Sequence, residues 1–278
     1  MQYIEVKCHI QPADLGNEIV TAFLAEIGYE SFMETEDGTL LAYIQQAFFN
    51  EKKLKHLLDG KNVDFTFSYE INTIQEENWN AVWESNYKPV LIENTCFIRA
   101  PFHEKRKNVQ YDIVIEPKMS FGTAHHETTA LMISYLLEED CNNKTVLDMG
   151  SGTGVLAILA SIKNAKKVYA IDNDKWAYDN CIENFERNKV KNIQAILGNA
   201  NHIHSIQFDI ITANINRNVL VQDMNTYVQH LKPTGIVLLS GFYANEDMDI
   251  IKANAATHGL HYHSYKQKNQ WAAVKFYK

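Results

Sequence analysis

The chain has 278 residues, of which 46% are hydrophobic and 22% charged, which is ordinary for a globular protein with a sizeable core. Its formal net charge of -8 argues against generic binding to nucleic-acid phosphates, which usually requires a basic face. The beginning of the sequence lacks the pattern of a signal peptide, and no apolar run approaches the roughly 20 residues that cross a bilayer. We therefore expect a cytoplasmic protein without membrane contact.

The cysteines give no sign of a metal site or of disulfide bonds. They stand 40 or more residues apart, at Cys8, Cys96, Cys141 and Cys181. Metal sites and disulfide frameworks use closer and more regular spacings. We expect no bound metal ion from these residues.

The first 73 residues predict a small α+β domain. A strand-like start at residues 3–10 precedes a helical pattern at 14–27, with Gly28 where a helix would end. A turn at Asp37-Gly38 separates two strand-like pieces, and a helix at 51–58 and a strand at 63–71 follow. The order β-α-β-β-α-β is that of a ferredoxin-like domain. Since no segment holds a cluster of catalytic residues, we expect this domain to present a substrate.

Residues 74–90, IQEENWNAVWESNYKPV, predict a linker helix. Trp79, Val82 and Trp83 would lie on one of its faces, and the simplest interpretation is that they pack the linker onto a domain. This assignment divides the chain into residues 1–73, the linker and residues 91–278.

Residues 91–278 predict an α/β fold with a mostly parallel sheet. Strand-like pieces at 95–100 and 111–116 precede a helical pattern at 127–138. From Thr145 onward, short apolar strands alternate with helices, which implies a parallel sheet covered on both faces. The last two pieces, 260–267 and 271–278, are too close in sequence for a crossover helix and should form an antiparallel hairpin at the sheet edge.

A glycine-rich turn follows the first strand of this region. The run VLDMGSGTG, residues 146–154, leads from an apolar strand through Gly150, Gly152 and Gly154 into a helix. Glycines let the backbone turn tightly and approach a ligand, and the helix start adds unpaired N–H groups. Asp172 ends the next strand, 22 residues after Gly150, where a carboxylate can accept the hydroxyls of a ribose. The alternative for Asp172 is a cap of the helix that starts near residue 173 or 174.

A nicotinamide dinucleotide is the rival ligand for this turn. Its fingerprint, Gly-x-Gly-x-x-Gly, would require a third glycine at position 155, which is Val155. The third glycine stands one residue earlier. The pattern therefore favours S-adenosylmethionine, which has no pyrophosphate to place at the helix start.

Two further segments carry candidate site residues. Asn214 ends the strand FDIITAN, where its amide oxygen could accept from an amine and hold the nitrogen lone pair toward a methyl donor; the alternative is a turn or cap asparagine. In the run 120–129, SFGTAHHETT, adjacent His125 and His126 cannot easily converge on one ion, and the His-Glu-x-x-His spacing is lacking. Helix capping by Thr128 or Glu127, or a wall of the cofactor pocket, is expected instead.

The combination of these motifs resembles the bacterial ribosomal protein L-11 methyltransferase family (PrmA) over nearly the full length. The features that carry the resemblance are the small first domain, the linker with ENW and VW, and FGTAHHETT ahead of DMGSGTGVLAI. The resemblance implies a class I, Rossmann-like methyltransferase whose first domain holds ribosomal protein L-11, and whose products are methylated α- and ε-amines. It implies cofactor contacts at Thr129, Gly150, Asp172 and Asn214, to which the glycine turn adds Gly152.

Two positions depart from the family pattern. Ala124 stands where the family usually has glycine, and it should be strained if φ is positive there, so the loop could take a different path. Asn199 stands where an aspartate commonly contacts the adenine; its carbonyl can still accept a hydrogen bond, but the charge is lost. We expect weaker adenine anchoring and the same cofactor.

The sequence thus predicts direct methyl transfer to a neutral amine, with Asn214 orienting the amine and no metal ion. We expect a monomer with no sequence-specific contact to nucleic acid. The alternatives are a class I methyltransferase for another protein or a small molecule, an NAD-dependent oxidoreductase, and a non-catalytic protein that retains the fold.

Overall fold

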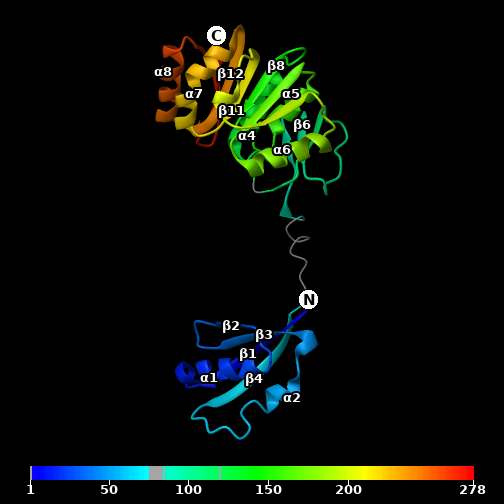
Figure 1. Cartoon of the computed structure of the whole chain (residues 1–278), viewed down its shortest axis with the longest axis vertical. Helices are drawn as coiled ribbons and strands as arrows, with labels where there is room; N and C mark the ends of the chain where they lie inside the picture. The colour runs from blue at the N-terminus through cyan, green and yellow to red at the C-terminus, as the bar shows by residue number, and fades with distance from the viewer. Residues whose placement is uncertain (1, 75–83, 85, 119) are drawn as a thin grey trace. The chain divides into compact units, whose positions relative to one another are not determined.

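The computed structural model describes residues 2–74, 84, 86–118 and 120–278. The chain divides into two compact units, Met1–Asn86 and Tyr87–Lys278 (Figure 1). Most of the predicted linker helix, including Trp79, Val82 and Trp83, lies outside the described residues. Within those residues, no helix combines the length and the apolar character needed to cross a membrane.

Over residues 2–74, the smaller unit forms one antiparallel sheet with two helices. Its elements are β1 (Tyr3–Gln11), α1 (Ala13–Glu26), β2 (Ser31–Glu34), β3 (Leu40–Gln45), α2 (Glu51–Lys55) and β4 (Thr66–Ile74), with a short 3-10 turn, Gln46–Phe48, before α2. The strand order is β2-β3-β1-β4, and every pairing is antiparallel. Val6 and Cys8 of β1 alternate with less buried neighbours and belong, with Leu24 of α1, to the core of this unit. The element order β-α-β-β-α-β is the one that the sequence predicted.

The larger unit begins with a three-stranded sheet and one helix. The strands β5 (Val90–Ile92), β6 (Cys96–Arg99) and β7 (Tyr111–Val114) lie in that order, and α4 (Glu127–Glu138) follows. The pattern at 127–138 therefore located α4 correctly. Strand β5, only three residues long, was not predicted.

A seven-stranded sheet carries the rest of the larger unit. Its elements are β8 (Thr145–Met149), α5 (Val155–Ile162), β9 (Lys167–Asp172), α6 (Lys175–Arg187), β10 (Ile193–Leu197), a 3-10 turn (Ala200–His202), β11 (Phe208–Asn214), α7 (Arg217–His230), β12 (Leu231–Tyr243), α8 (Glu246–Thr257), β13 (His261–Lys268) and β14 (Trp271–Tyr277). The strand order is β10-β9-β8-β11-β12-β14-β13, in which β14 runs antiparallel to both of its neighbours and the other pairings are parallel. The predicted α/β fold with a C-terminal antiparallel hairpin is confirmed.

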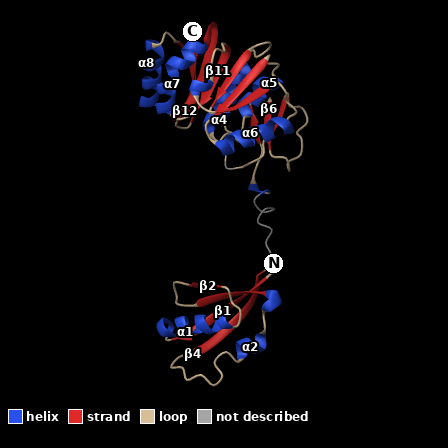
Figure 2. Cartoon of the chain, viewed as in Figure 1, coloured by secondary structure: helices blue, strands red, loops and turns tan. Residues whose placement is uncertain are grey.

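Helices cover both faces of this sheet (Figure 2). On strand β8, Val146 belongs to the core beneath α4, α5 and α6, whereas Leu147 and Met149 belong to the core beneath α7 and α8. Successive side chains of a strand point to opposite faces, so a strand buried on both faces is apolar throughout. The apolar runs in the sequence follow from this double burial.

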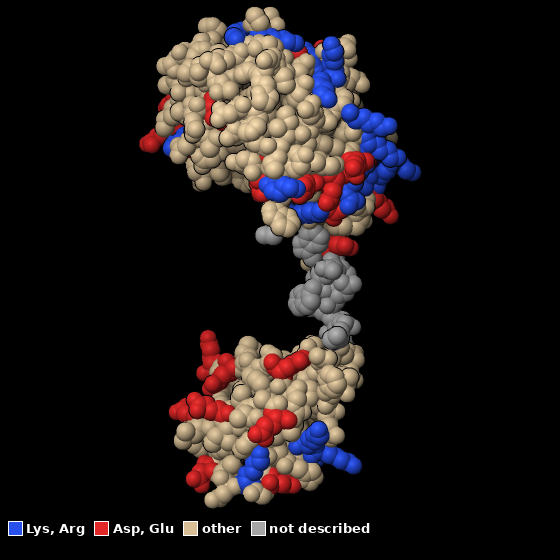
Figure 3. Space-filling model, in the orientation of Figure 1, with Lys and Arg blue, Asp and Glu red and all other residues tan. Residues whose placement is uncertain are grey.

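The two units carry very different charge. The smaller unit has 15 Asp and Glu against 5 Lys and no Arg, whereas the larger unit has 19 Asp and Glu against 21 Lys and Arg. The formal charges are therefore -10 and +2. Figure 3 shows the acidic side chains spread over the smaller unit, and lysines and arginines gathered along one side of the larger one.

Candidate functional site

The turn after β8 is a close-packed loop that only glycine fits. Gly150, Gly152 and Gly154 all have positive φ, at 69°, 53° and 79°. A Cβ atom on Gly152 would lie 2.2 Å from the carbonyl oxygen of Phe121, and one on Gly150 would lie 2.1 Å from Cγ2 of Ile215. The glycines are therefore required by both backbone conformation and space.

Asp172, at the end of β9, holds this loop in place. Its Oδ2 accepts a hydrogen bond from the Gly152 N–H at 2.8 Å, and its Oδ1 accepts from the Asp174 N–H at 3.0 Å. The N-cap of α6 is Asp174, whose side chain accepts from the Trp176 N–H, so Asp172 is not the helix cap. Each oxygen of Asp172 retains a lone pair that could accept a ribose hydroxyl.

Asp148 lies buried beneath the same loop. Gly154 caps α5 without a side chain, and Oδ2 of Asp148 accepts from the Ala157 N–H of the first helical turn instead. Burial raises the pKa of the Asp148 carboxyl to about 7, although hydrogen bonds from Thr212 and Ala157 lower it and the charge of Asp172 raises it further. This residue was not among the predicted ones.

A cavity of about 190 Å³ opens beside the glycine loop and Asp172. Gly150, Asp172 and Asn199 line it, together with Ile171, Gly198 and Ile215. The Asn199 side-chain oxygen accepts from the Asn201 N–H at 3.1 Å and thereby caps a short 3-10 turn. We call this space the loop cavity; it lies at the carboxyl ends of β8, β9 and β10, where open α/β sheets bind their ligands.

A second cavity, of about 250 Å³, shares Ile215 with the loop cavity. Its lining includes Asn214 and three aromatic residues, Phe121, His126 and Trp271. The Asn214 Nδ2 donates to Oγ1 of Thr129, 3.3 Å away, while the buried Oδ1 has no hydrogen-bond partner in the part of the chain that the structure describes. An unpaired buried amide oxygen is costly, so this atom is available to a donor that enters the cavity. We call this second space the amide cavity.

The two adjacent histidines of the HHETT run have different roles. Nε2 of His125 lies 2.7 Å from the Lys88 carbonyl oxygen and can donate to it, whereas Nδ1 of His126 accepts from the Thr128 N–H and makes His126 the N-cap of α4. The predicted capping by Thr128 or Glu127 is therefore wrong. Ring contacts join His126 to Phe121 and Trp271, with centroids 5.2 and 4.7 Å apart, and all three line the amide cavity. That this segment also borders the cofactor stays a prediction. No group of three or more metal-ligating side chains occurs among the described residues.

Asparagines of α6 fasten the chain that leads into the amide cavity. Asn188 pairs with both backbone groups of Val114, at 2.8 and 2.7 Å. One turn earlier, Asn184 accepts from the Glu116 N–H and donates to the Thr153 carbonyl, both at 2.9 Å. Four residues of helix advance by about 6 Å, which is close to the length of two residues of extended chain. Asn184 and Asn188, four residues apart, therefore reach Glu116 and Val114, two residues apart.

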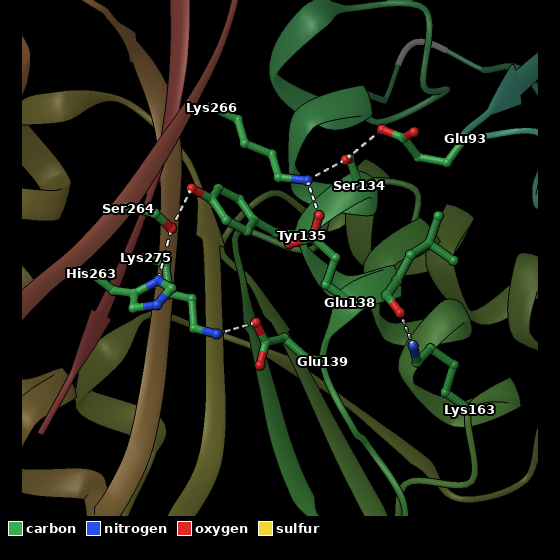
Figure 4. A network of polar contacts seen from close by, with 11 residues as sticks. Glu93, Ser134, Tyr135, Glu138, Glu139, Lys163, His263, Ser264, Lys266 and Lys275 are labelled. Carbon is green, nitrogen blue, oxygen red and sulfur yellow. Dashed lines mark hydrogen bonds and ion pairs between the residues drawn. The ribbon is translucent and has the colours of Figure 1, made fainter.

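Charged residues fix the other end of α4 (Figure 4). Lys266 of β13 donates to Ser134 at 2.6 Å and to Glu138 at 2.5 Å, and Ser134 donates to Glu93 at 2.8 Å. Lys275 of β14 forms an ion pair with Glu139. These bonds tie α4, whose first turn carries His126 and Thr129, to the terminal hairpin.

Ala124 adopts φ +68° and is 1% exposed. The positive φ anticipated for this position is present despite the Cβ atom. The alanine therefore takes the left-handed conformation that glycine favours.

Comparison with known proteins places this chain in a family. The family model of ribosomal protein L11 methyltransferase (PrmA) matches residues 11–278. Ribosomal protein L11 methyltransferases of Phocaeicola vulgatus and Bacteroides thetaiotaomicron are 42% and 43% identical to this chain, each over 99% of both proteins. A ribosomal protein L11 methylase structure from Lactobacillus delbrueckii subsp. bulgaricus shares the fold, with a TM-score of 0.64 and 24% identity over 68% of this chain and 98% of that one. The chain belongs to the ribosomal protein L11 methyltransferase family and is a methyltransferase.

Proposed function

We propose that this enzyme transfers methyl groups from S-adenosylmethionine to the N-terminal α-amine and lysine ε-amines of ribosomal protein L11 in the cytoplasm. The observation that carries the proposal is the buried Oδ1 of Asn214, which has no hydrogen-bond partner among the described residues. An amine has N–H groups to donate, and this oxygen would accept one of them. The full-length similarity to proteins of that name supports the choice of substrate.

The residues present fit the cofactor. The glycine loop gives a side-chain-free backbone, and Asp172 has lone pairs for two hydroxyls. Asn199 and Gly150 line the loop cavity and would hold the cofactor there, and Gly152, whose N–H is bonded to Asp172, would keep the adjoining loop in place. Thr129 would contact the cofactor beside Asn214, to which it is already bonded.

The cofactor supplies a methyl group that is activated on a sulfonium, and the chain's own residues orient the acceptor. The Thr129 hydroxyl accepts from Asn214 Nδ2 and so fixes the amide with its oxygen free. An amine that donates to this oxygen would have its lone pair directed away from it, toward the methyl carbon.

The acceptor amine must be neutral before it attacks. A lysine ε-amine has an ordinary pKa of about 10.4, and transfer into an apolar pocket lowers that pKa. The amide cavity supplies such walls, in Phe121, Ile215 and Trp271. Water can take the proton, and no dedicated base is needed for this role.

The acidic smaller unit supports a basic protein as the substrate. Its formal charge of -10 favours encounter with a cationic partner and raises the association rate at low salt. A second candidate, methylation of another protein or of a small molecule, uses the same cavities. An oxidoreductase is disfavoured by Val155, which occupies the place of the third glycine of the nicotinamide fingerprint.

The test is intact-mass analysis of purified ribosomal protein L11 after incubation with the enzyme and S-adenosylmethionine. We expect mass gains in steps of about 14 Da, absent with Asp172→Ala, because that carboxylate holds the loop and would accept hydrogen bonds from the cofactor. A parallel titration measures cofactor binding. Binding without mass gain would reject this substrate, and absence of both would reject the proposal.

A further inference from the structure

A row of lysines lies at the amino ends of three adjacent parallel strands. One lysine stands just before β8, two begin or precede β9, and two precede β10: Lys144, Lys166, Lys167, Lys189 and Lys191. The pairings Thr145↔Lys167 and Val168↔Ile193 place the starts of these strands side by side. Neighbouring strands are about 4.8 Å apart, so the five charges form one row.

None of these five lysines has a carboxylate within ion-pair distance among the residues described. Lys166, Lys189 and Lys191 are exposed, and Lys144 and Lys167 are half-buried. By contrast, Lys118 and Arg187 form ion pairs, with Glu183 and Glu116 respectively. The row therefore presents net positive charge to solvent.

The basic run 105–107 extends the row. These three residues are exposed, and they precede β7, whose first residue, Tyr111, has its ring 5.8 Å from Nζ of Lys163 at the end of α5. Figure 3 shows lysine and arginine atoms gathered along this side of the larger unit. We call the five lysines of the row and residues 105–107 the basic edge.

The basic edge is polar as well as charged. No exposed large hydrophobic side chain lies in its segments 104–108, 142–145, 163–168 and 187–193. Asn108, Asn143 and Asn164 form left-handed turns there and add exposed amide groups. Protein interfaces are depleted in lysine and enriched in aromatic residues, whereas phosphate backbones are contacted by Lys, Arg and Asn. The chemistry therefore favours a phosphate backbone over a protein surface.

We propose that the basic edge binds the phosphate backbone of RNA without sequence preference. The net charge of -8, from which the sequence argued against such binding, arises in the smaller unit, which carries -10, whereas the larger unit that bears the basic edge carries +2. The proposal rests on the proposed function only for its biological setting, since a ribosomal protein substrate is found beside ribosomal RNA. The basic edge lies at the amino ends of the parallel strands, and the loop cavity lies at their carboxyl ends. Bound RNA would therefore leave the active site open.

The size of the expected effect follows from the number of lysines. If the five lysines of the row each neutralise one phosphate of a duplex, the logarithm of affinity falls with the logarithm of salt with a slope of about -4.5. Raising the salt from about 50 to about 200 mM would then weaken binding about 500-fold. Each lysine that is removed should reduce the slope by about 1.

The test is fluorescence anisotropy with a labelled RNA duplex of arbitrary sequence and about 20 base pairs, titrated with the full-length enzyme at several salt concentrations. The variant is Lys166→Glu with Lys191→Glu. The matched control is Lys252→Glu with Lys268→Glu, which makes the same change in net charge in α8 and β13, at the other edge of the sheet. Anionic phosphatidylserine vesicles serve as a second probe, and methylation of free L11 is measured for all three proteins.

We expect the basic-edge variant to lose at least tenfold in RNA affinity and to keep its methylation of free L11, while the control variant retains both. Equal loss in the two variants, absence of salt-dependent binding, or binding to vesicles in preference to RNA would overturn the proposal. Failure of all three proteins to methylate L11, with RNA binding as expected, would reject the proposed function and leave the basic edge standing.

Discussion

Asp148→Asn is expected to stabilise the protein above neutral pH. Asp148 is 1% exposed, and the groups around its carboxyl can satisfy the hydrogen bonds of the protonated form. Protonated Oδ1 can donate to Thr212, 2.9 Å away, whose hydroxyl then donates to the Leu147 carbonyl at 3.2 Å, while Oδ2 accepts from Ala157. An asparagine reproduces this pattern with its Nδ2 and Oδ1 and carries no charge.

The sign and size follow from the pKa shift. Burial raises the pKa of Asp148 from its ordinary value of 3.8 to about 7, so between these values the folded state holds a proton that the unfolded state has lost. Stability therefore falls as the pH rises through this window and is lowest above pH 7, where both states are ionised. From about pH 5 to about pH 8, the wild type should lose about 3 kcal/mol relative to the variant.

Calorimetry of both proteins without cofactor, at a series of pH values, measures this difference. The quantity compared is the melting temperature of the variant minus that of the wild type. We expect this difference to be about 6–12 °C larger at pH 8 than at pH 5. Asp209→Asn is the control of opposite sign. Burial raises the pKa of Asp209, but the bonds from Lys232 and the Thr145 N–H outweigh it and hold the pKa below its ordinary value. Because the pKa of Asp209 is 3.8 or lower in both states, that variant should be least stable relative to wild type at pH 5 and above, and the deficit should shrink as the pH falls below about 4. A difference for Asp148→Asn that does not change with pH would refute the reasoning.

Three substitutions at the site have distinct expected outcomes. Gly152→Ala should abolish cofactor binding, measured by calorimetric titration, because the new Cβ would lie 2.2 Å from a carbonyl oxygen. The control is Gly259→Ala, where φ is also positive but the space is open, and it should cost only about 1–2 kcal/mol of stability. Asn214→Ala should reduce kcat about 100-fold and change cofactor affinity less than about threefold; strong loss of affinity at normal turnover would contradict the orienting role. Asn184→Ala should destabilise by about 2–3 kcal/mol in chemical denaturation, since it leaves two backbone groups unpaired.

The sheet could be located from the sequence because its strands are continuous apolar runs that alternate with helical patterns. Strands buried on both faces are apolar throughout, and their ends carry Gly150, Asp172 and Asn214, so topology alone places these three residues at one edge. Site residues that lie outside the ends of the parallel strands had no comparable pattern in the sequence. Trp271 reaches the amide cavity from the terminal hairpin, and Phe121 reaches it from a loop that α6 fastens.

The asparagines of α6 show why such residues are missed. Asn184 and Asn188 stand four residues apart, a spacing that marks one face of a helix but reads as a solvated face when the residues are polar. Asn184 is fully buried because its partners are backbone groups of Glu116 and Thr153, 68 and 31 positions earlier in the chain. Asp148 is similar, since its position in an apolar strand does not reveal that it accepts a hydrogen bond from the first turn of α5.

The strain at Ala124 can be isolated by comparison with a second buried alanine. Ala124 has φ +68°, which costs about 1–2 kcal/mol for a residue with a Cβ atom. Ala124→Gly would remove this strain. It would lose about as much stability because the unfolded chain becomes more flexible and because a buried methyl group is deleted. Its unfolding free energy should therefore change by less than about 1 kcal/mol.

Ala160→Gly removes an equally buried methyl group from the middle of α5, where no strain exists, and should cost about 2 kcal/mol. Chemical denaturation of the two variants measures the difference directly. Because both changes delete the same atoms from fully buried sites, the excess cost at Ala160 equals the strain that is released at Ala124. Equal losses in the two variants would show that the loop before α4 accommodates alanine without strain, and that the departure from the family pattern has no energetic consequence.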